Sequence, residues 1–341
     1  MTAEEKGNGV LVTGAAGFIG SFLCPRLMQE GYAVTALDMD EKRMATLKQT
    51  GMDVVIGDLT KPETIEGVCN GIGTVIHLAA HVKSWGTKKV FYDSIFHATK
   101  NLLDEAAKNK CRFIYFSSIC AAGAGGLKEH LIGHREDDPE HRTGNSFYCD
   151  AKYDAEKLVL GYHGQGRVEA TIIRPANVIG PGSVWVTDMI ETINKGPVFP
   201  IIDGGRYNGC FVYVQNLVDG IVLTMTKEIS KGKTYHFRDD YTETWKDYVT
   251  DLGVILGKDV KFFSIPFALA WGLGYLGDKL LRPLNVRITT SRHTVGLTGR
   301  DNTVDTSRAR NELGWKTRIP YRKAMDEIGH WVKNEYMRQK V

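Results

Sequence analysis

The sequence predicts an α/β fold built on a doubly wound parallel sheet, with a smaller C-terminal lobe. Three observations support this prediction. Short β-rich apolar runs alternate with helical patterns in the first half, a glycine-rich turn follows the first run, and Gly/Pro punctuation replaces the alternation beyond Gly180. The 341 residues, 43% of them hydrophobic, are enough for one large domain with an appended lobe.

Six short apolar runs account for the expected parallel strands, because each has the length of a buried strand and is bounded by turn residues. These runs are 10–13, 33–37, 54–56, 74–78, 113–117 and 171–174. Between them, apolar residues recur at three- and four-residue spacing, which predicts crossover helices over residues 18–29, 89–108 and 148–162.

The second half of the chain is expected to be shared between the sheet and the lobe. Residues 211–214 and 234–237 are predicted to return to the main sheet, while 188–194 and 245–256 have helical patterns. The resulting division assigns 1–180, with 205–237 returning to it, to the sheet domain, and 181–204 with 238–341 to a substrate-binding lobe.

Charge and cysteine usage narrow the class of protein. The 43 Lys and Arg against 40 Asp and Glu give a net charge of +3, too small a bias to indicate nucleic acid as a partner. Six cysteines stand singly, with no CxxC pair, which favours a reducing cytoplasm. The polar N-terminus lacks the apolar core of a signal peptide, and no apolar run reaches the roughly 20 residues of a spanning helix.

A glycine-rich loop follows the first predicted strand and opens the first helix. Residues 13–20 read TGAAGFIG, with Gly14, Gly17 and Gly20 spaced three and three. Glycines permit a tight turn and bring the backbone close to a pyrophosphate, so that the helix N-terminus faces the anion. In this context the loop predicts a Rossmann dinucleotide site rather than an ordinary strand-to-helix turn.

Asp38 ends the second predicted strand and favours NAD over NADP as the cofactor. A carboxylate there accepts hydrogen bonds from the adenosine ribose hydroxyls and would repel a 2′-phosphate. Arg43 lies close by and could reach a 2′-phosphate instead, although a solvated helix charge is the simpler interpretation.

Tyr148 and Lys152 are four residues apart, on one face of a predicted helix. A nearby cation favours the phenolate and is expected to lower the pKa of Tyr148 from about 10, so that the phenol can exchange a proton with an alcohol or ketone. Such a pair also occurs by chance on surface helices. It gains weight here because Ser118 supplies a hydroxyl just after an earlier strand.

Together with residues 13–20, four further motifs follow in a recognisable order: Gly57-Asp58-Leu59, His77-Leu78-Ala79-Ala80, RPANVIGPG at 174–182 and DTSRARNELGW at 305–315. In this order the chain resembles the extended short-chain dehydrogenase/reductase family, also called the NAD-dependent epimerase/dehydratase superfamily, over nearly all of its length. The last of these motifs corresponds to a structural segment of that family.

The resemblance implies roles for named residues. Tyr148 would be the general acid/base, Lys152 would tune it and bind the nicotinamide ribose, and Ser118 would hydrogen-bond the reacting oxygen, with Ser117 pointing away. It also implies a homodimer formed by helices of the main domain. The residues expected to bind NAD are Gly14, Ala16, Gly17, Phe18, Ile19, Gly20, Asp38, Asp58, Leu59, Leu78, Ala79, Ala80, Tyr148, Lys152, Pro175, Asn177 and Val178.

One motif departs from the family pattern. The helix segment that usually reads Asn-Val-x-Gly-Thr-x-Asn is IFHATKN at residues 95–101, so that Ile95 replaces the customary asparagine. A proton relay through that asparagine is therefore in doubt for this chain.

Two features separate the branches of the family by substrate. Gly209 stands where enzymes acting on nucleotide sugars carry a diphosphate-clamping arginine, although Arg206 could compensate. The segment 213–217, YVQNL, together with Ser117-Ser118-Ile119 and Ser84-Trp85-Gly86, resembles the 3β-hydroxysteroid dehydrogenase branch. We therefore expect oxidation or reduction of an apolar, steroid-like or long-chain substrate.

Two alternatives remain open. One is a nucleotide-sugar epimerase or dehydratase, for which Asn177 could contact the sugar, and the other is an NAD-sensing regulator without catalysis. The Tyr148/Lys152 pair argues against the regulator. No metal site is expected from the loop histidines His130, His134 and His141, and a packed, hydrogen-bonded role is expected for His77 and His81.

The least polar stretch of the chain, within residues 262–281, has two interpretations. It could be a core helix of the lobe, since buried helices are often apolar all round. It could instead be an apolar lid over the substrate that makes a peripheral contact with a membrane, because Trp271 and Tyr275 share a helical face and suit an interfacial position.

Overall fold

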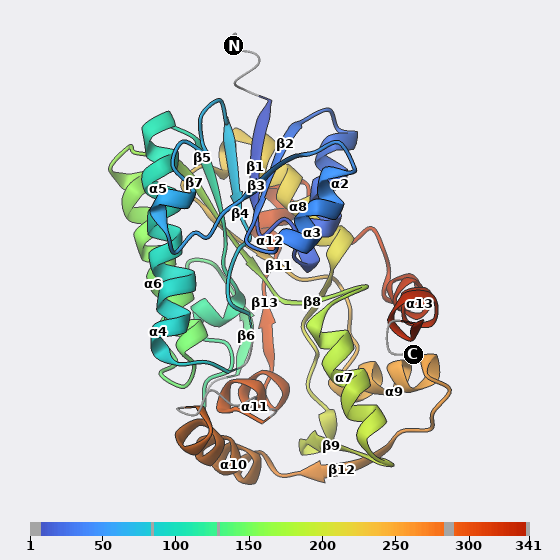
Figure 1. The fold of residues 1–341 in the computed structure, drawn as a ribbon. Helices are drawn as coiled ribbons and strands as arrows, with labels where there is room; N and C mark the ends of the chain where they lie inside the picture. Colours follow the sequence, from blue (N-terminus) through green and yellow to red (C-terminus); the bar gives the residue numbers. More distant parts are fainter. Residues whose placement is uncertain (1–7, 83–84, 128–129, 283–289, 339–341) are drawn as a thin grey trace.

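The computed structural model describes residues 8–82, 85–127, 130–282 and 290–338 and consists of a large sheet domain with a smaller lobe beneath it (Figure 1). Seven parallel strands form the sheet, in the order β11-β7-β5-β4-β1-β2-β3. Their bounds are β1 Gly9–Thr13, β2 Ala33–Asp38, β3 Asp53–Ile56, β4 Thr74–His77, β5 Arg112–Phe116, β7 Glu169–Pro175 and β11 Thr234–Phe237. The α/β prediction is confirmed, and all six runs predicted in the first half are strands of this sheet.

Helices cover both faces of the sheet, which is why its strands read as continuous apolar runs. Every residue of β1 and β5 is buried. On one face, α2 and α8 pack against the sheet around a core that includes Leu23 and Ile221, and on the other, α5 and α6 pack around Leu102 and Val159. The helices of the sheet domain are α2 Phe18–Gln29, α3 Glu41–Lys48, α4 Lys88–Phe91, α5 Ala98–Asn109, α6 Phe147–Gly164, α8 Val214–Thr226 and α12 Ser307–Leu313.

The helix predicted over residues 89–108 is interrupted by a π-helical segment, η2 (Tyr92–His97), which joins α4 to α5. Such segments frequently mark functional sites. Short 3₁₀ turns complete the connections: η1 Pro62–Thr64, η3 Ile119–Ala122, η4 Asp203–Gly205 and η5 Glu228–Ser230.

The smaller lobe is built from three two-stranded parallel sheets and five helices. The strand pairs are β6 Leu131–His134 with β13 Asn302–Val304, β8 Asn177–Ile179 with β10 Phe211–Tyr213, and β9 Val198–Ile202 with β12 Lys261–Ile265. The helices are α7 Val184–Lys195, α9 Trp245–Ile255, α10 Phe267–Leu280, α11 Arg292–Thr298 and α13 Tyr321–Trp331, which continues into η7 Val332–Tyr336.

One strand assignment was wrong. Residues 234–237 return to the main sheet as β11, but residues 211–213 form β10, which pairs with β8 outside that sheet. The backbone past Pro175 turns away from the sheet, and β10 follows this extension instead of adding an eighth strand. The division of the chain into a sheet domain and a substrate-binding lobe stays a prediction.

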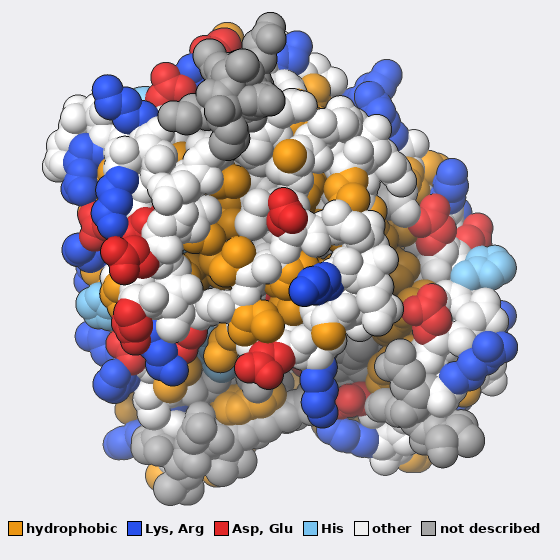
Figure 2. All heavy atoms as spheres, turned by 45° about the horizontal axis from the view of Figure 1, so that its top comes forward, with side chains coloured by type: hydrophobic (Ala, Val, Ile, Leu, Met, Phe, Trp, Pro, Cys, Tyr) orange, Lys and Arg blue, Asp and Glu red, His pale blue; other side chains and the backbone are white. Residues whose placement is uncertain are grey.

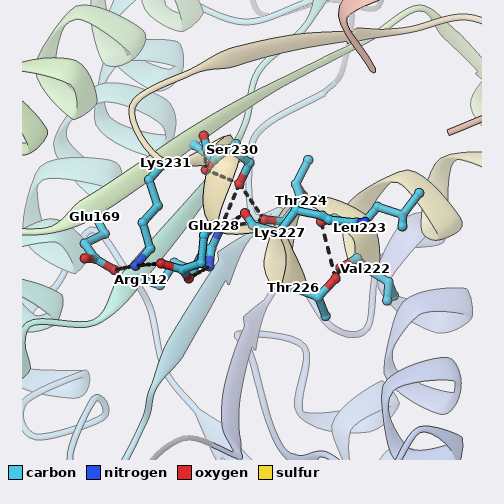
Figure 3. Close-up of polar contacts among 11 residues, drawn as sticks. Arg112, Glu169, Val222, Leu223, Thr224, Thr226, Lys227, Glu228, Ser230 and Lys231 are labelled. Carbon is cyan, nitrogen blue, oxygen red and sulfur yellow. Dashed lines mark hydrogen bonds and ion pairs between the residues drawn. The ribbon is translucent and has the colours of Figure 1, made fainter. Parts of the chain in front are cut away.

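Arg112 fixes the end of α8 beside the edge strand β11 (Figure 3). The guanidinium is 9% exposed and donates to the carbonyl oxygens of Thr224 and Lys227 at 3.0 and 2.6 Å and to Ser230 Oγ at 2.8 Å. Glu228 adds an ion pair at 3.1 Å. A cation on the last carbonyls of a helix satisfies groups that have no partner within the helix.

The cysteines, the apolar helices and the surface charges of the structure bear on what the composition predicts. All six cysteines are free and buried. Among the described residues, no helix is both long and apolar enough to cross a bilayer. Figure 2 shows Lys, Arg, Asp and Glu side chains of both signs along the outline of one face and hydrophobic side chains near its middle, in keeping with the small net charge.

Candidate active site

The glycine-rich loop forms a cradle between β1 and α2. Gly14 has φ +69°, and a Cβ added there would lie 2.8 Å from the Ala79 nitrogen. A Cβ on Gly20 would lie 2.5 Å from the Ala15 carbonyl oxygen. The first turn of α2, with Phe18 and Ile19, starts at Gly17, which has no side chain to cap it. Its N–H groups are therefore available to an anion, and the loop fits a dinucleotide pyrophosphate.

Asp38 lies half-buried at the end of β2, beside this cradle. Its carboxylate accepts hydrogen bonds from the Ala16 and Met39 amides at 3.2 and 2.8 Å, which fix its position next to the glycine-rich loop. The Arg43 side chain is 68% exposed, and its guanidinium lies 3.4 Å from the Ala16 carbonyl oxygen. The Asp38 carboxylate and the Arg43 guanidinium, the two groups considered for contact with the ribose 2′ position of the cofactor, thus both lie next to Ala16.

The turn after β3 carries Asp58 and Leu59. Burial raises the pKa of Asp58, but hydrogen bonds from the Thr60 hydroxyl and amide outweigh it, so the pKa is lowered overall and Asp58 is held as a carboxylate. The Leu59 carbonyl accepts a hydrogen bond from Asn101 Nδ2 at 2.9 Å. This contact ties the turn to α5 and leaves the carboxylate at the surface.

A buried hydrogen-bonded chain lies under the cradle. His77 Nδ1 is 2.8 Å from Thr13 Oγ1, and His77 Nε2 is 3.0 Å from Thr99 Oγ1. Burial lowers the pKa of His77 to about 3, so the imidazole stays neutral. The packed role expected for His77 is what the structure contains. Leu78, Ala79 and Ala80 continue from it as a half-buried segment beside Gly14.

Tyr148 and Lys152 lie on one face of α6, which Ser146 caps by accepting a hydrogen bond from the Cys149 amide at 3.4 Å. The Lys152 side chain is 3% exposed, and Nζ donates to the Phe116 carbonyl at 2.5 Å and lies 4.9 Å from the Tyr115 ring centroid. Burial lowers the pKa of Lys152 to about 8. The ammonium is thus anchored at the C-terminal end of β5.

The phenol of Tyr148 is half-buried, and its environment differs from the expectation. Burial and the neighbouring thiols of Cys120 and Cys149 raise the pKa of Tyr148 well above 10, although a hydrogen bond with Ser118 acts to lower it. The pKa is therefore raised rather than lowered, because burial and the two thiols outweigh the effect of Ser118.

Ser118, and not Ser117, faces this phenol. Ser118 is half-buried at the start of η3, its Oγ accepts a hydrogen bond from the Cys120 amide at 3.3 Å, and its hydroxyl is close enough to Tyr148 to act on the pKa of the phenol. Ser117 is 3% exposed, its amide donates to the Ile173 carbonyl at 2.7 Å, and its Oγ has no partner among the described residues. The interpretation of Ser117 as a residue turned away from the site is consistent with this burial.

Two neighbours of the tyrosine were not predicted. His293, from α11 of the smaller lobe, has its ring centroid 6.1 Å from that of Tyr148, and its Nδ1 lies 3.4 Å from Cys149 Sγ. Burial lowers the pKa of His293 to about 4, so the imidazole is neutral. The Phe91 ring lies 6.4 Å from Tyr148 on the other side. No local sequence pattern links α11 to the site, since the contact depends on tertiary folding.

A buried ion pair between Glu156 and Arg174 was not predicted, although the sequence pattern indicates the glutamate. Glu156 follows Tyr148 and Lys152 on the same face of α6 and is fully buried. Its carboxylate binds the guanidinium of Arg174 on β7, with Nε and Oε1 2.9 Å apart. Extending the four-residue spacing from Lys152 by one further turn identifies this glutamate.

The segment from Pro175 to Val178 leaves β7 and enters β8. The Asn177 side chain is 5% exposed and donates through Nδ2 to the Gly209 carbonyl at 2.8 Å. A Cβ on Gly209 would lie 1.9 Å from the Phe211 ring, so no arginine fits this position without moving the ring. The exposed Arg206 instead donates to the Tyr207 hydroxyl at 2.9 Å.

The part of the chain that the structure describes contains no group of three or more His, Cys, Asp or Glu side chains that could hold a metal ion. His134 packs against His236, with ring centroids 5.8 Å apart, and His130 lies 4.0 Å from Asp301. Of the motif Ser84-Trp85-Gly86, the serine lies outside the described residues.

A family model supplies the deciding comparison: the one described as the NAD dependent epimerase/dehydratase family matches residues 10–237, well over half of the chain. The chain belongs to the NAD-dependent epimerase/dehydratase family. It is therefore an NAD-dependent oxidoreductase, and the cradle, Asp38 and the Tyr148/Lys152 helix lie within the matched range.

Similar proteins include two of nearly equal length. A ketoreductase of Stigmatella aurantiaca, named for 4-hydroxy-2-methyl-3-oxo-4-farnesyl-3,4-dihydroquinoline-1-oxide, is 27% identical over 93% of this chain and 94% of its own. A putative dihydroflavonol 4-reductase of Synechocystis is 27% identical over 95% and 94%. The solved structure of an epimerase from Methanothermobacter thermautotrophicus shares the fold, with a TM-score of 0.79, 19% identity and coverage of 99% and 95%.

Ile95, which stands where the family pattern has an asparagine, is a buried residue with no polar side-chain atom. Ile95 lies within the π-helical segment η2, is 1% exposed and offers only its backbone carbonyl, which accepts a hydrogen bond from Thr99 Oγ1 at 2.5 Å. An apolar side chain there cannot relay a proton, so Lys152 has no asparagine side chain at this position to connect with.

Proposed function

We propose that this protein transfers a hydride between NAD and the carbonyl carbon of an apolar substrate, interconverting a ketone and a secondary alcohol. One observation carries the proposal. Tyr148 and Lys152 lie on one face of α6, Lys152 is anchored to the Phe116 carbonyl at the C-terminal end of β5, and Ser118 starts η3 just beyond the same strand end. Parallel α/β sheets bind ligands at this edge.

The proposed roles follow from these positions. Bound NADH supplies the hydride to the carbonyl carbon. Tyr148 donates its hydroxyl proton to the developing alkoxide, and Ser118 hydrogen-bonds the same oxygen. A phenol with a raised pKa is protonated at neutral pH, as ketone reduction requires. Lys152 holds the nicotinamide ribose through its ammonium.

The residues proposed to bind NAD surround this centre. Residues of the glycine-rich loop and of the segment after β4 are proposed to hold the pyrophosphate: Gly14, Ala16, Gly17, Phe18, Ile19, Gly20, Leu78, Ala79 and Ala80. We propose that Asp38, Asp58 and Leu59 bind the adenosine. We propose that Pro175, Asn177 and Val178 bind the nicotinamide. Asp38 is proposed to exclude a 2′-phosphate, because its carboxylate is fixed beside the ribose position.

An apolar substrate is favoured over a nucleotide sugar by the surroundings of Gly209. At the position of the diphosphate clamp a side chain would collide with the Phe211 ring as it lies here, and Arg206 is engaged by Tyr207. The names of the two relatives, a ketoreductase of a farnesylated quinoline and a dihydroflavonol reductase, favour reduction of a carbonyl on a ring system. We propose a steroid-like or prenylated ring ketone as the substrate class.

We further propose a cytoplasmic homodimer, associated through helices of the main domain, that makes a peripheral membrane contact through residues 262–281.

A substrate screen tests the proposal. NADH absorbance is followed with steroid ketones, dihydroflavonols, prenylated quinoline ketones and UDP-glucose, using the full-length protein. Turnover of at least one apolar ketone is expected, with none of UDP-glucose. Turnover confined to the UDP-sugar would overturn the substrate class, and NAD binding without turnover of any compound would favour a regulator.

A further inference from the structure

The outer face of α10 carries a stripe of large apolar side chains. Leu269, Leu273, Leu276 and Leu280 are 57, 50, 51 and 62% exposed, and their spacing places them on one side of the helix. Tyr275, 47% exposed, lies beside them. We call these five residues the α10 apolar face. The core-helix interpretation of this segment was therefore wrong.

The opposite side of α10 packs on the protein and includes the small residues Ala270 and Gly274. Phe267 and Ala270 are buried with Val295 of α11. A Cβ on Gly274 would lie 2.9 Å from the Arg292 nitrogen, so the helix lies directly against the start of α11. A soluble helix ordinarily buries its large apolar side chains, whereas α10 turns four leucines outward. Exposed apolar patches of this kind mark interaction sites.

The charges around this face favour an anionic partner. Asp278, the one carboxylate within residues 267–282, is buried and paired with Arg282 and Arg292 at 2.7 and 2.9 Å. Lys279 is exposed on the same helix. The Arg292 guanidinium lies 5.3 Å from the Tyr275 ring centroid, at the edge of the apolar face. The face therefore offers leucines and cations, and no exposed carboxylate.

The geometry of α10 argues for a lipid surface over a second copy of the chain. A 14-residue helix is roughly 21 Å long and 10 Å across, which gives a footprint of about 200 Å². A stable dimer buries about 800 Å² per partner. Amphipathic helices of this length, with aromatic and basic residues beside an apolar face, bind in the interfacial plane of a bilayer.

We propose that the α10 apolar face docks onto an anionic lipid bilayer and holds the smaller lobe against the membrane. This inference rests on the proposed function for the apolar nature of the substrate. α10 lies at the tip of the smaller lobe, at the opposite end of the molecule from the start of β1 (Figure 1). A bilayer there meets the lobe without obstruction from the sheet domain.

Side-chain contacts connect the two ends of this region to the neighbourhood of Tyr148. The Arg282 guanidinium, just beyond the end of α10, lies 4.9 Å from the ring centroid of Phe147, which precedes Tyr148. On the other side, α11 connects Arg292 to His293, whose ring neighbours Tyr148. The α10 apolar face is therefore connected by packed side chains to the helix that carries Tyr148.

Vesicle flotation with the full-length protein tests the docking, without cofactor or substrate. We expect the wild type to float with phosphatidylcholine vesicles that contain phosphatidylglycerol, and less with phosphatidylcholine alone. Leu273→Ser/Leu276→Ser should weaken binding by roughly tenfold or more, because two leucines no longer leave water. Val254→Ser is the matched control, since Val254 is 71% exposed on α9 and lies outside the face.

A second variant and a mass measurement keep the test decisive. Lys279→Glu places a carboxylate beside the face and should reduce binding to anionic vesicles several-fold, whether or not the double leucine variant folds. Light scattering should give the same solution mass for all variants. A wild type that binds neither vesicle, or a double variant that loses an oligomer while vesicle binding is unchanged, overturns the inference.

The docking and the proposed function can fail separately. If the wild type binds no vesicles but turns over a water-soluble ketone, the docking of the α10 apolar face is overturned and the proposed reaction stands. Intact vesicle binding in a protein that turns over no ketone would overturn the proposed reaction and leave the docking in place.

Discussion

Glu156 and Arg174 form an almost completely buried ion pair, with side chains 0 and 1% exposed. Glu156 lies one helical turn beyond Lys152, which lies one turn beyond Tyr148. The pair therefore fixes the face of α6 that carries Tyr148 and Lys152 against β7, and Glu140 binds the same guanidinium from the segment before α6.

Glu156→Gln is expected to destabilise the protein by about 2 kcal/mol, because it removes the fully buried one of the two carboxylates that bind Arg174, while Glu140 still compensates part of the charge. The free energy of unfolding from urea titration measures the loss. Arg322→Ala serves as the control, since its ion pair with Asp251 is at the surface and should contribute about 1 kcal/mol or less. A Glu156→Gln protein as stable as the control would contradict this account of α6.

Tyr148→Phe should lower turnover by about 10² to 10⁴-fold while NAD affinity stays within about twofold, because only the proton-donating hydroxyl is lost. Tyr153→Phe is the matched control on the same helix, where the ring contacts Arg142 and Lys157. Steady-state kinetics with a ketone found in the screen, together with NAD titration, separates the two effects. Equal turnover in the two variants would remove Tyr148 from the reaction.

NAD affinity is expected to fall as the pH rises through about 8. Burial lowers the pKa of Lys152 from 10.5 to about 8, so the ammonium proposed to hold the ribose is fully charged below that pH and neutral above it. Calorimetric titration from about pH 7 to about pH 9.5 should show a loss of roughly tenfold. Lys152→Arg should remove this pH dependence, because a guanidinium stays charged. A flat wild-type profile would contradict the ribose contact.

Asp38→Ser should relax the preference for NAD over NADP, since it removes the charge that would face a 2′-phosphate. Titration with both cofactors measures the change, which we expect to be about tenfold or more. Arg43→Ala is the companion variant and should leave the wild-type preference unchanged. If the wild type binds NADP more tightly than NAD and Arg43→Ala abolishes this, Arg43 rather than Asp38 sets the selection.

The alternation of apolar runs and helical spacing was sufficient to predict the main sheet, because each βαβ unit is specified locally. The pairing of the three-residue strand β10 was not predictable in this way, since the choice of β8 over the main sheet depends on where the chain turns after Pro175. Short strands carry too few residues to indicate their partners.

In the candidate site, too, the features set by local spacing were predictable and those set by tertiary packing were not. The helix spacing placed Tyr148 and Lys152 on one face. It did not indicate the Phe116 carbonyl that holds the ammonium, or the burial and neighbouring thiols that raise the pKa of the phenol. His293 reaches the site from a helix of the other lobe, which no local pattern indicates. The apolar composition of 262–281 was evident, whereas the direction its leucines face depends on how α10 packs on α11.

The glycine that starts α2 also has a thermodynamic consequence. Since Gly17 offers no capping side chain, the first turn of α2 lacks a partner for its N–H groups within the protein. A bound pyrophosphate acts as the missing cap, so part of the folding free energy of the working enzyme is contributed by its ligand. At a hundredfold excess over the dissociation constant this linkage amounts to about 2.7 kcal/mol. The resistance of the protein to heat and proteolysis in a cell would then follow the supply of NAD.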